Sequence, residues 1–340
     1  MDLFGAHLTV LTLCFALAVG GLTVLLSAVV GLYLWPLRRR ALRDAPSQPL
    51  DFASATRAAE ATVAAEAADP GVRPESRSRL LSHGTRTGRV VLLLHGYTLG
   101  PEQYDELARE FFARGYNVWV PRAPHHGTAD RRAHHRVEAT ELTAYAAQAL
   151  TVAAGLGDEV GVVGISGGAV LAAWLAQVRG DVVRRLLLLS PFFGPDPRQA
   201  PAFAVKPLIV LYGRRLLSDR VNSRGYSFSA VTQYLTIARN LPDPPRRTGL
   251  LTAAVAMSPL DGVVDPVAAV TVPRRIAEAS GIQLRVCMLP EALAVRHDVL
   301  DLASLGADGP ALHRLYVALY AGEPTPTPTA GLARTSSAGE

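Results

Sequence analysis

The sequence Gly164-Ile165-Ser166-Gly167-Gly168 follows the apolar run Val160 to Val163 and precedes the alanine-rich segment Ala169 to Gln177. This order indicates a buried strand that turns sharply into a helix, with a serine at the turn. A serine in so tight a turn takes a strained backbone conformation, and side chains two residues away on either side would collide there. Glycine at positions 164 and 168 removes the collision. The pattern is therefore that of a G-x-S-x-G nucleophile elbow.

The same turn predicts chemistry for Ser166. The helix that begins after it directs free backbone N–H groups and the positive end of its dipole toward the serine, which favours a developing oxyanion. On this interpretation Ser166 is a nucleophile and the N–H of Gly167 is an oxyanion donor. The alternative is a glycine-rich strand-to-helix turn with an incidental serine, in a chain that has 29 glycines. The choice depends on whether an acid and a base follow in the order that such sites use.

Length and composition limit the class of protein. With 340 residues, of which 49% are hydrophobic, the chain can bury one large core or two ordinary ones. The net charge of +5 is carried almost wholly by arginine, because Lys206 is the only lysine. No basic cluster is interleaved with aromatic residues, so we expect no nucleic-acid partner. Cys14 and Cys287 lie far apart in apolar runs without histidines at ligand spacing, and we expect neither a disulfide nor a cysteine zinc site.

The beginning of the chain is typical of a membrane anchor. No charged residue occurs from Leu8 to Trp35, a run long enough for a helix to cross a bilayer. Tyr33 and Trp35 fit an interfacial belt, and arginines follow at positions 38, 39, 40 and 43. The start Met-Asp-Leu-Phe lacks the basic residue of a cleaved signal peptide. We therefore expect residues 1–40 to be an uncleaved anchor with its basic flank, and the arginines favour placing the remainder of the chain on the cytoplasmic side.

Composition divides the rest of the chain into three parts. Residues 41–79 are rich in Ala, Arg, Pro and Ser with little apolar bulk, so we expect a tether, in which residues 53–68 could form a helix. Residues 80–321 alternate apolar strands with helices, which favours an α/β fold with a parallel sheet covered on both faces. Residues 322–340, with repeated Pro-Thr and an end rich in Gly, Ser and Ala, predict a disordered tail.

The alternation within residues 80–321 stops once. Strands are expected at residues 89–94, 116–120, 160–163, 183–189, 250–256 and 282–288, with helices at 139–153, 169–177 and 267–279 and a closing helix around 312–319. Between residues 191 and 248 no strand is evident, and two amphipathic helices are expected, Leu208 to Leu217 and Ser229 to Leu241. An insertion of this length between two strands of a sheet predicts a helical cap over the site.

An acid and a base for Ser166 do follow along the chain. A serine hydroxyl needs a base, and the base needs an orienting carboxylate. Asp261 comes after the expected strand 250–256, and His297 lies in a loop after the expected strand 282–288, where parallel sheets place their sites. In this arrangement His297 takes the proton from Ser166, and Asp261 holds the imidazole tautomer. The second oxyanion donor is expected from the loop after the first strand, as the N–H of Tyr97.

Two other aspartates compete with Asp261 as the acid. Asp265 could serve, although it could instead cap the helix that begins at Pro266. Asp196 would be an acid displaced onto the preceding strand. Both alternatives remain open from the sequence.

Several histidines permit other interpretations. His95 could act as a base, although a histidine at this position more often supports loop geometry. The pairs His125-His126 and His134-His135, with Asp130 between them, could indicate a metal. Adjacent histidines point in different directions and lack the usual ligand spacing, so we expect a polar rim of the pocket, with neither a metal nor an organic cofactor.

Taken together, the motifs resemble the α/β-hydrolase superfamily, and more narrowly its bacterial carboxylesterase, monoacylglycerol lipase and serine aminopeptidase-like group. The resemblance covers about residues 80–321 and rests on the motifs at 92–98, 114–118, 164–168, 261–264 and 297–300. It implies a mostly parallel sheet of eight strands, a cap inserted after the strand that follows the elbow helix, and hydrolysis through an acyl-enzyme. The chain departs from the resemblance at His125, in a loop where relatives often carry Pro-Gly-His-Gly.

The sequence therefore predicts a membrane-anchored serine hydrolase that cleaves a carboxylic ester through Ser166, His297 and Asp261. A small or lipid-derived ester is the expected substrate, because the anchor and the apolar cap helices would suit one. The alternatives are a serine peptidase or thioesterase on the same triad, and a non-catalytic binding module at the membrane. The leaving group, the acyl chain and the oligomeric state stay open, since a fold does not fix them.

Overall fold

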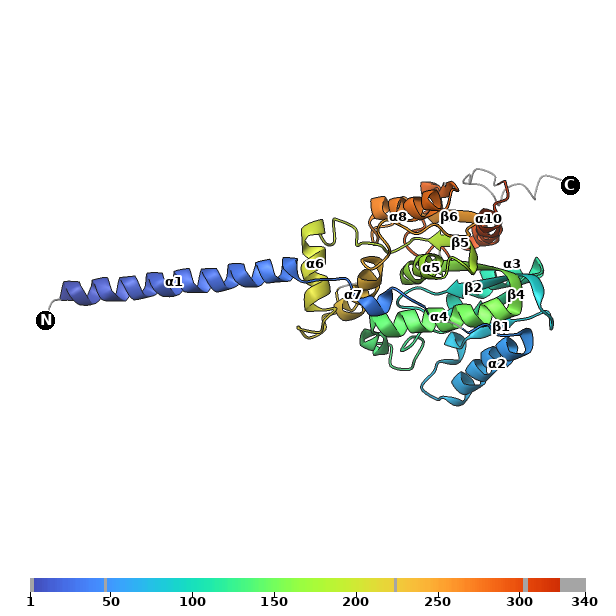
Figure 1. The fold of residues 1–340 in the computed structure, drawn as a ribbon, viewed down its shortest axis with the longest axis horizontal. Helices are drawn as coiled ribbons and strands as arrows, with labels where there is room; N and C mark the ends of the chain where they lie inside the picture. The colour runs from blue at the N-terminus through green and yellow to red at the C-terminus, as the bar shows by residue number, and fades with distance from the viewer. Residues whose placement is uncertain (1–2, 46–47, 223–224, 302–304, 325–340) are drawn as a thin grey trace.

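A long apolar helix, α1 (Leu3–Leu34), projects from a body of strands and helices (Figure 1). The computed structural model describes residues 3–45, 48–222, 225–301 and 305–324. Within α1, Leu11–Leu34 has a mean hydropathy of 2.5, none of it is buried in the protein, and by length and composition it could cross a membrane. Of the predicted tail, residues 325–340 lie outside the described part of the chain.

The body is built on a seven-stranded sheet with the strand order β1-β3-β2-β4-β5-β6-β7. All neighbouring strands run parallel except β1, which pairs antiparallel with β3. Side chains alternate between the two faces, so that Val90, Leu92 and Leu94 enter one core while Val91 and Leu93 enter the other. The strands are β1 (Arg79–Leu81), β2 (Thr87–Leu94), β3 (Asn117–Val120), β4 (Gly157–Ile165), β5 (Val183–Leu189), β6 (Thr252–Met257) and β7 (Leu284–Met288).

The described sheet thus has seven strands where the family resemblance implied eight. The segment before β1 forms a helix, α2 (Phe52–Ala68), which packs against a helix of the body. Its alanine-rich sequence favours a helix, and the carboxylate of Asp51 caps the first turn by accepting a hydrogen bond from the backbone N–H of Ser54.

Helices cover both faces of the sheet. The first core contains side chains of α2, α4 (Ala139–Leu156), α5 (Gly167–Val178) and α8 (Pro266–Ala279). The second core contains side chains of α3 (Asp105–Ala113) and α10 (Gly309–Ala321). Short 3₁₀ helices occur at Arg40–Leu42, Pro74–Ser76, Pro101–Tyr104, Ala133–Arg136, Glu291–Leu293 and Gly306–Asp308. The expected α/β architecture with helices on both faces is confirmed.

Between β5 and β6 the chain leaves the sheet and forms a helical cap. Its helices are α6 (Ala202–Leu211) and α7 (Phe228–Ala238); α7 packs against both α5 and α6. Both helices were expected, but α6 begins and ends earlier than predicted, and Pro207 lies inside it. A proline is more typical of a first helical turn, which explains why the sequence favoured a start at Leu208.

In the segment expected to be a tether, the described residues 41–45 and 48–79 pack on the body. Leu42 is fully buried, and its carbonyl accepts a hydrogen bond of 2.7 Å from Trp174 Nε1. Helix α2 packs against α4, where Ala55 lies too close to Gly155 for any side chain at position 155. Contacts between small residues replace the apolar bulk that the sequence lacks, so this segment is part of the body rather than a free tether.

Candidate active site

Ser166 lies at the turn between β4 and α5 with φ 54° and ψ −115°. A residue other than glycine rarely adopts this conformation, so the backbone is strained at the serine. The two glycines make the turn possible. A Cβ on Gly164 would lie 2.5 Å from the carbonyl carbon of Gly168, and a Cβ on Gly168 would lie 2.5 Å from the carbonyl oxygen of His95. The strand, turn and helix expected at this motif are present.

The side chains of Ser166, His297 and Asp261 form one hydrogen-bonded chain. The distance from His297 Nε2 to Ser166 Oγ is 2.9 Å, and that from His297 Nδ1 to Asp261 Oδ2 is 2.8 Å. The side chain of Asp261 is fully buried, and its other carboxylate oxygen accepts a 2.8 Å hydrogen bond from the N–H of Val263. A proton on Nδ1, donated to the carboxylate, leaves Nε2 free to accept the serine proton. The geometry suits proton transfer from the hydroxyl to the imidazole.

Both expected oxyanion donors line the cavity that contains Ser166. Gly167 is the first residue of α5, where a backbone N–H has no partner within the helix. Tyr97 follows β2, and its phenol oxygen accepts a 2.8 Å hydrogen bond from the N–H of Ser227 and donates at 3.3 Å to the carbonyl of the same residue. Burial raises the pKa of Tyr97. Tyr234 covers Gly167, since a Cβ there would lie 2.8 Å from the ring. The cap thus contacts both Tyr97 and Gly167.

Gln103 joins two loops of the site and was not selected from the sequence. Its Oε1 accepts a 2.8 Å hydrogen bond from the N–H of Gly96, and its Nε2 donates at 3.0 Å to Asp298. The loop that carries Tyr97 is therefore tied to the loop that carries His297. Burial raises the pKa of the Asp298 carboxyl. A single glutamine near the start of a helix has no sequence signal that would reveal this role.

The competing aspartates bind other groups. Asp265 caps α8 by accepting hydrogen bonds from the N–H groups of Val267, at 2.9 Å, and Ala268, at 3.2 Å. Asp196 accepts a 3.0 Å hydrogen bond from the guanidinium of Arg198. Of the carboxylates considered from the sequence, the one bonded to His297 is Asp261.

His95 is held entirely by backbone groups. Its Nε2 accepts a 2.9 Å hydrogen bond from the N–H of Ala123, so Nδ1 carries the proton and donates at 2.9 Å to the carbonyl of Gly96. Burial lowers the pKa of His95 to about 4, which keeps the ring neutral. The ring supports the loop beneath the oxyanion donors and has no nitrogen left for Ser166.

The histidine pairs of the following loop do not line the cavity that contains Ser166, so the expected polar rim of that pocket is not found there. His126 and His134 line a small cavity together with Asp130, with their ring centroids 6.0 Å apart. Burial lowers the pKa of His126 to about 3. His125 also lines this cavity, and its Nε2 lies 3.1 Å from Glu141 Oε1. Among the described residues, no group of three or more His, Cys, Asp or Glu side chains could hold a metal ion.

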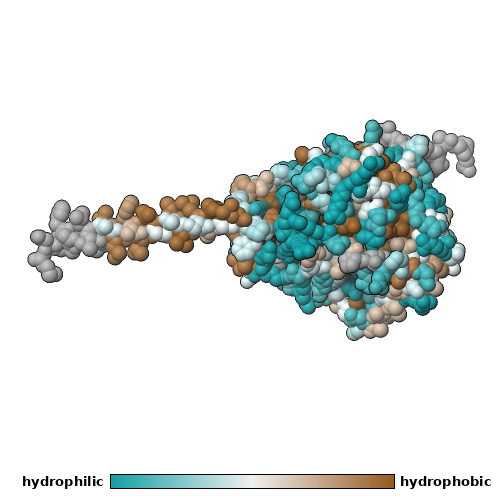
Figure 2. Space-filling view, in the orientation of Figure 1, coloured by the Kyte–Doolittle hydropathy of each residue, from teal (hydrophilic) through white to brown (hydrophobic). Residues whose placement is uncertain are grey.

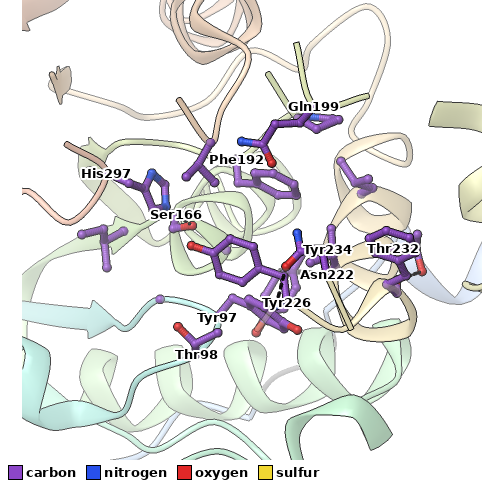
Figure 3. A pocket seen from close by; sticks show the side chains of 18 of the residues that line it. Tyr97, Thr98, Ser166, Phe192, Gln199, Asn222, Tyr226, Thr232, Tyr234 and His297 are labelled. Atoms are coloured by element: carbon purple, nitrogen blue, oxygen red, sulfur yellow. Dashed lines mark hydrogen bonds between the residues drawn. The ribbon is translucent and has the colours of Figure 1, made fainter. Parts of the chain in front are cut away.

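A cavity of about 380 Å³ extends from Ser166 to the cap. In Figure 3, Ser166 and His297 lie on one side of it, while Asn222, Tyr226 and Thr232 lie on the other. Its apolar lining includes Phe192, Leu208, Phe228, Val231 and Leu235. The site can therefore hold an apolar group beside the serine hydroxyl.

Comparisons with known proteins agree with this architecture. The model of the alpha/beta hydrolase family matches residues 91–329, more than half of the chain. A structure reported for the metagenome-derived lipolytic enzymes LipS and LipT superimposes with a TM-score of 0.57 and 19% identity over 74% of this chain and 100% of that one. The monoacylglycerol lipase of Paleococcus ferrophilus superimposes with a TM-score of 0.55 and 15% identity, over 72% of this chain and 98% of that one. A soluble variant of monoglyceride lipase from Saccharomyces cerevisiae superimposes with a TM-score of 0.52 and 12% identity, over 72% of this chain and 91% of that one. No curated protein matches the chain.

Proposed function

This chain belongs to the alpha/beta hydrolase family, and from that premise we propose that it is a membrane-anchored serine hydrolase that cleaves carboxylic esters. The observation that carries the proposal is the hydrogen-bonded chain from Ser166 through His297 to Asp261, with distances of 2.9 and 2.8 Å. A binding module would have no need to align a hydroxyl, an imidazole and a buried carboxylate.

In the proposed reaction, His297 Nε2 takes the proton of Ser166 as Oγ attacks the ester carbonyl. The N–H groups of Tyr97 and Gly167 stabilise the oxyanion of the tetrahedral intermediate. Asp261 stabilises the imidazolium, which then protonates the departing alcohol and leaves an acyl-enzyme. Water, activated by the same imidazole, attacks the acyl group and releases a carboxylic acid. The chain's own side chains account for every proton transfer in this sequence.

We propose a lipid-derived ester as the substrate. Apolar cap side chains line much of the cavity beside Ser166, and an acyl chain is the part of an ester that such a lining would hold. The apolar helix α1 supports the proposal, because an anchor would keep the site near lipids. Two of the similar structures described above are named as monoacylglycerol and monoglyceride lipases.

The test of substrate class is hydrolysis of a series of esters that differ only in acyl length, with a thioester and a peptide amide of matched acyl group beside them. We expect faster turnover as the acyl chain lengthens beyond acetyl, and loss of turnover in Ser166→Ala. The control is Asp265→Asn, because Asp265 caps α8 outside the cavity. A sharp preference for acetyl would contradict a lipid-derived substrate. Faster turnover of the thioester would indicate a thioesterase, and faster turnover of the amide would indicate a peptidase.

We also propose that the catalytic body lies on the cytoplasmic side, supported by the arginines at positions 38, 39, 40 and 43. The test uses Val267→Cys, at a position that is 67% exposed. A maleimide that cannot cross the bilayer should label this cysteine only after the cells are permeabilised. Labelling of intact cells would place the body outside.

A further inference from the structure

We infer that the cap makes a second contact with the bilayer, in addition to α1. The contact is the interfacial surface, which we define as Phe203 on α6 together with Leu216, Leu217 and Val221 in the chain that follows it. Its occupant is the headgroup and upper acyl region of the membrane that α1 crosses. The inference rests on the membrane anchoring in the proposed function. It adds the position of the cap and its cavity relative to the membrane surface.

The interfacial surface is apolar and open to solvent in the protein alone. Phe203 is 70% exposed, Leu216 54%, Leu217 46% and Val221 44%. Leu216 and Leu217 donate backbone hydrogen bonds to the carbonyl of Leu211, so the exposed side chains lie at both ends of α6. Exposed apolar side chains along one element mark a contact with a partner or a membrane. In Figure 2, apolar atoms also lie on the edge of the body that adjoins α1. The apolar surface of α1 therefore continues onto the body.

A hydrogen bond fixes the depth of this surface relative to α1. Tyr33 Oη donates to the carbonyl oxygen of Phe203 at 2.8 Å. The uncharged segment Leu8 to Trp35 ends just before the arginines at positions 38, 39, 40 and 43, whose charges stay in the headgroup region. Tyr33 is near the end of that segment, so it lies at the boundary between acyl chains and headgroups. Phe203, bonded to it, must lie at the same level.

The orientation of α6 agrees with an in-plane position. Helix α6 contacts α1 and runs across its end (Figure 1). If α1 crosses the bilayer, α6 lies along the membrane surface, as interfacial helices do. Lys206, the only lysine of the chain, is on this helix and can extend its amine toward the headgroups.

The body cannot swing away from this position on a flexible stalk. The side chain of Asn240, just after α7, accepts a 2.6 Å hydrogen bond from the N–H of Arg39 and donates at 2.9 Å to the carbonyl of Leu37. The guanidinium of Arg214 lies 5.9 Å from the ring centroid of Trp35. The chain that leaves α1 is thus held by the cap, and the cap keeps a fixed position relative to the anchor.

The charges of the cavity beside the end of the anchor suit anionic headgroups. Arg38, Arg43 and Arg246 line a cavity of about 210 Å³ directly after the anchor. The one acidic residue in that lining, Asp243, is paired with Arg275. Arginine clusters immediately beside a membrane span attract anionic lipids. Basic side chains and exposed apolar side chains on one cap are the composition of a region that rests on a bilayer.

The contact has a consequence for the site. Leu208, on the same helix as Phe203, lines the cavity that contains Ser166. Helix α6 therefore borders both the cavity and the interfacial surface, so the contact places the cavity directly behind the helix that faces the membrane.

The depth of the surface can be measured by electron paramagnetic resonance on the full chain, reconstituted in vesicles of phosphatidylcholine with a minority of phosphatidylglycerol. In a Cys14→Ala, Cys287→Ala background, a nitroxide is attached to Phe203→Cys or Leu216→Cys. The matched control is Leu251→Cys, which is 47% exposed and lies just before β6, at the end of the sheet opposite the cap. A label on native Cys14, with Cys287→Ala, reports whether α1 is inserted.

We expect the labels at positions 203 and 216 to lie about 5–10 Å below the lipid phosphates and to be shielded from a water-soluble nickel chelate. The label at position 251 should be fully accessible to the chelate. Equal accessibility at 203 and 251, with Cys14 in the bilayer, would overturn the inference while leaving the anchor intact. A label on Cys14 exposed to water would overturn both. Because the readout needs no hydrolysis, failure of the catalytic proposal would not change it.

Discussion

Replacing Gly168 with alanine tests how closely α5 packs on the end of β2. The new Cβ would lie 2.5 Å from the carbonyl oxygen of His95 and 2.6 Å from the carbonyl carbon of Leu94. Both neighbours are backbone atoms, so no side-chain rotation can relieve the contact. The start of α5 must therefore move away by about 1 Å, and crowding of this kind costs about 1–3 kcal/mol of folding free energy, occasionally more. Since Ser166 precedes α5 directly, a displacement of about 1 Å should lower kcat/KM about 100-fold.

Denaturant unfolding measures the loss of stability, and ester hydrolysis by the folded fraction measures kcat/KM. The control is Gly88→Ala in β2, because a Cβ at position 88 meets no atom within 4 Å. We expect Gly88→Ala to change both quantities little. If Gly168→Ala kept the stability and the activity of the parent, the close contact between elbow and strand would be refuted.

The remaining predictions concern the acid, the oxyanion loop and the buried histidine. Asp261→Asn should lower kcat about 10⁴-fold, because an amide can donate to His297 Nδ1 and leave the proton on Nε2; steady-state kinetics with less than tenfold loss would argue against this role. Tyr97→Phe should lower the free energy of unfolding by about 1–3 kcal/mol, since buried backbone groups of Ser227 lose their partner; an unchanged denaturation midpoint would refute it. Burial lowers the pKa of His95 from 6.5 to about 4, so as the pH falls the imidazole is protonated in the unfolded chain before it is protonated in the folded one. Above pH 6.5 the neutral His95 ring therefore contributes its full share, about 3 kcal/mol, to the free energy of unfolding. This contribution is lost as the pH falls from 6.5 to about 4. Unfolding measured across that range should be less pH-dependent in His95→Asn, and an identical slope would contradict the assignment.

The central sheet could be predicted because its strands are continuous apolar runs. The expected strand 183–189 coincides with β5, and the expected run 160–163 lies within β4. The packing of residues 41–79 could not be predicted in the same way. It depends on contacts between small residues, such as Ala55 and Gly155, and such contacts leave no trace in hydrophobic periodicity.

The geometry of the site was partly accessible from the sequence. Ser166, Asp261 and His297 each follow a strand, and the carboxyl ends of parallel strands meet at one edge of a sheet. Gln103 and Tyr234 could not be selected, because their contacts join segments far apart in the chain. The contact between α1 and the cap was equally inaccessible, since it joins residues 33 and 203.

The account rests on an activated serine at position 166, and a fluorophosphonate tests it most directly. The probe is added to the folded protein, and the modified residue is located by mass spectrometry. We predict an adduct on Ser166 that is absent from Ser166→Ala, strongly reduced in His297→Ala and retained in Asp265→Asn. Folded protein that forms no adduct, or forms it on another serine, would contradict the proposed hydrolase.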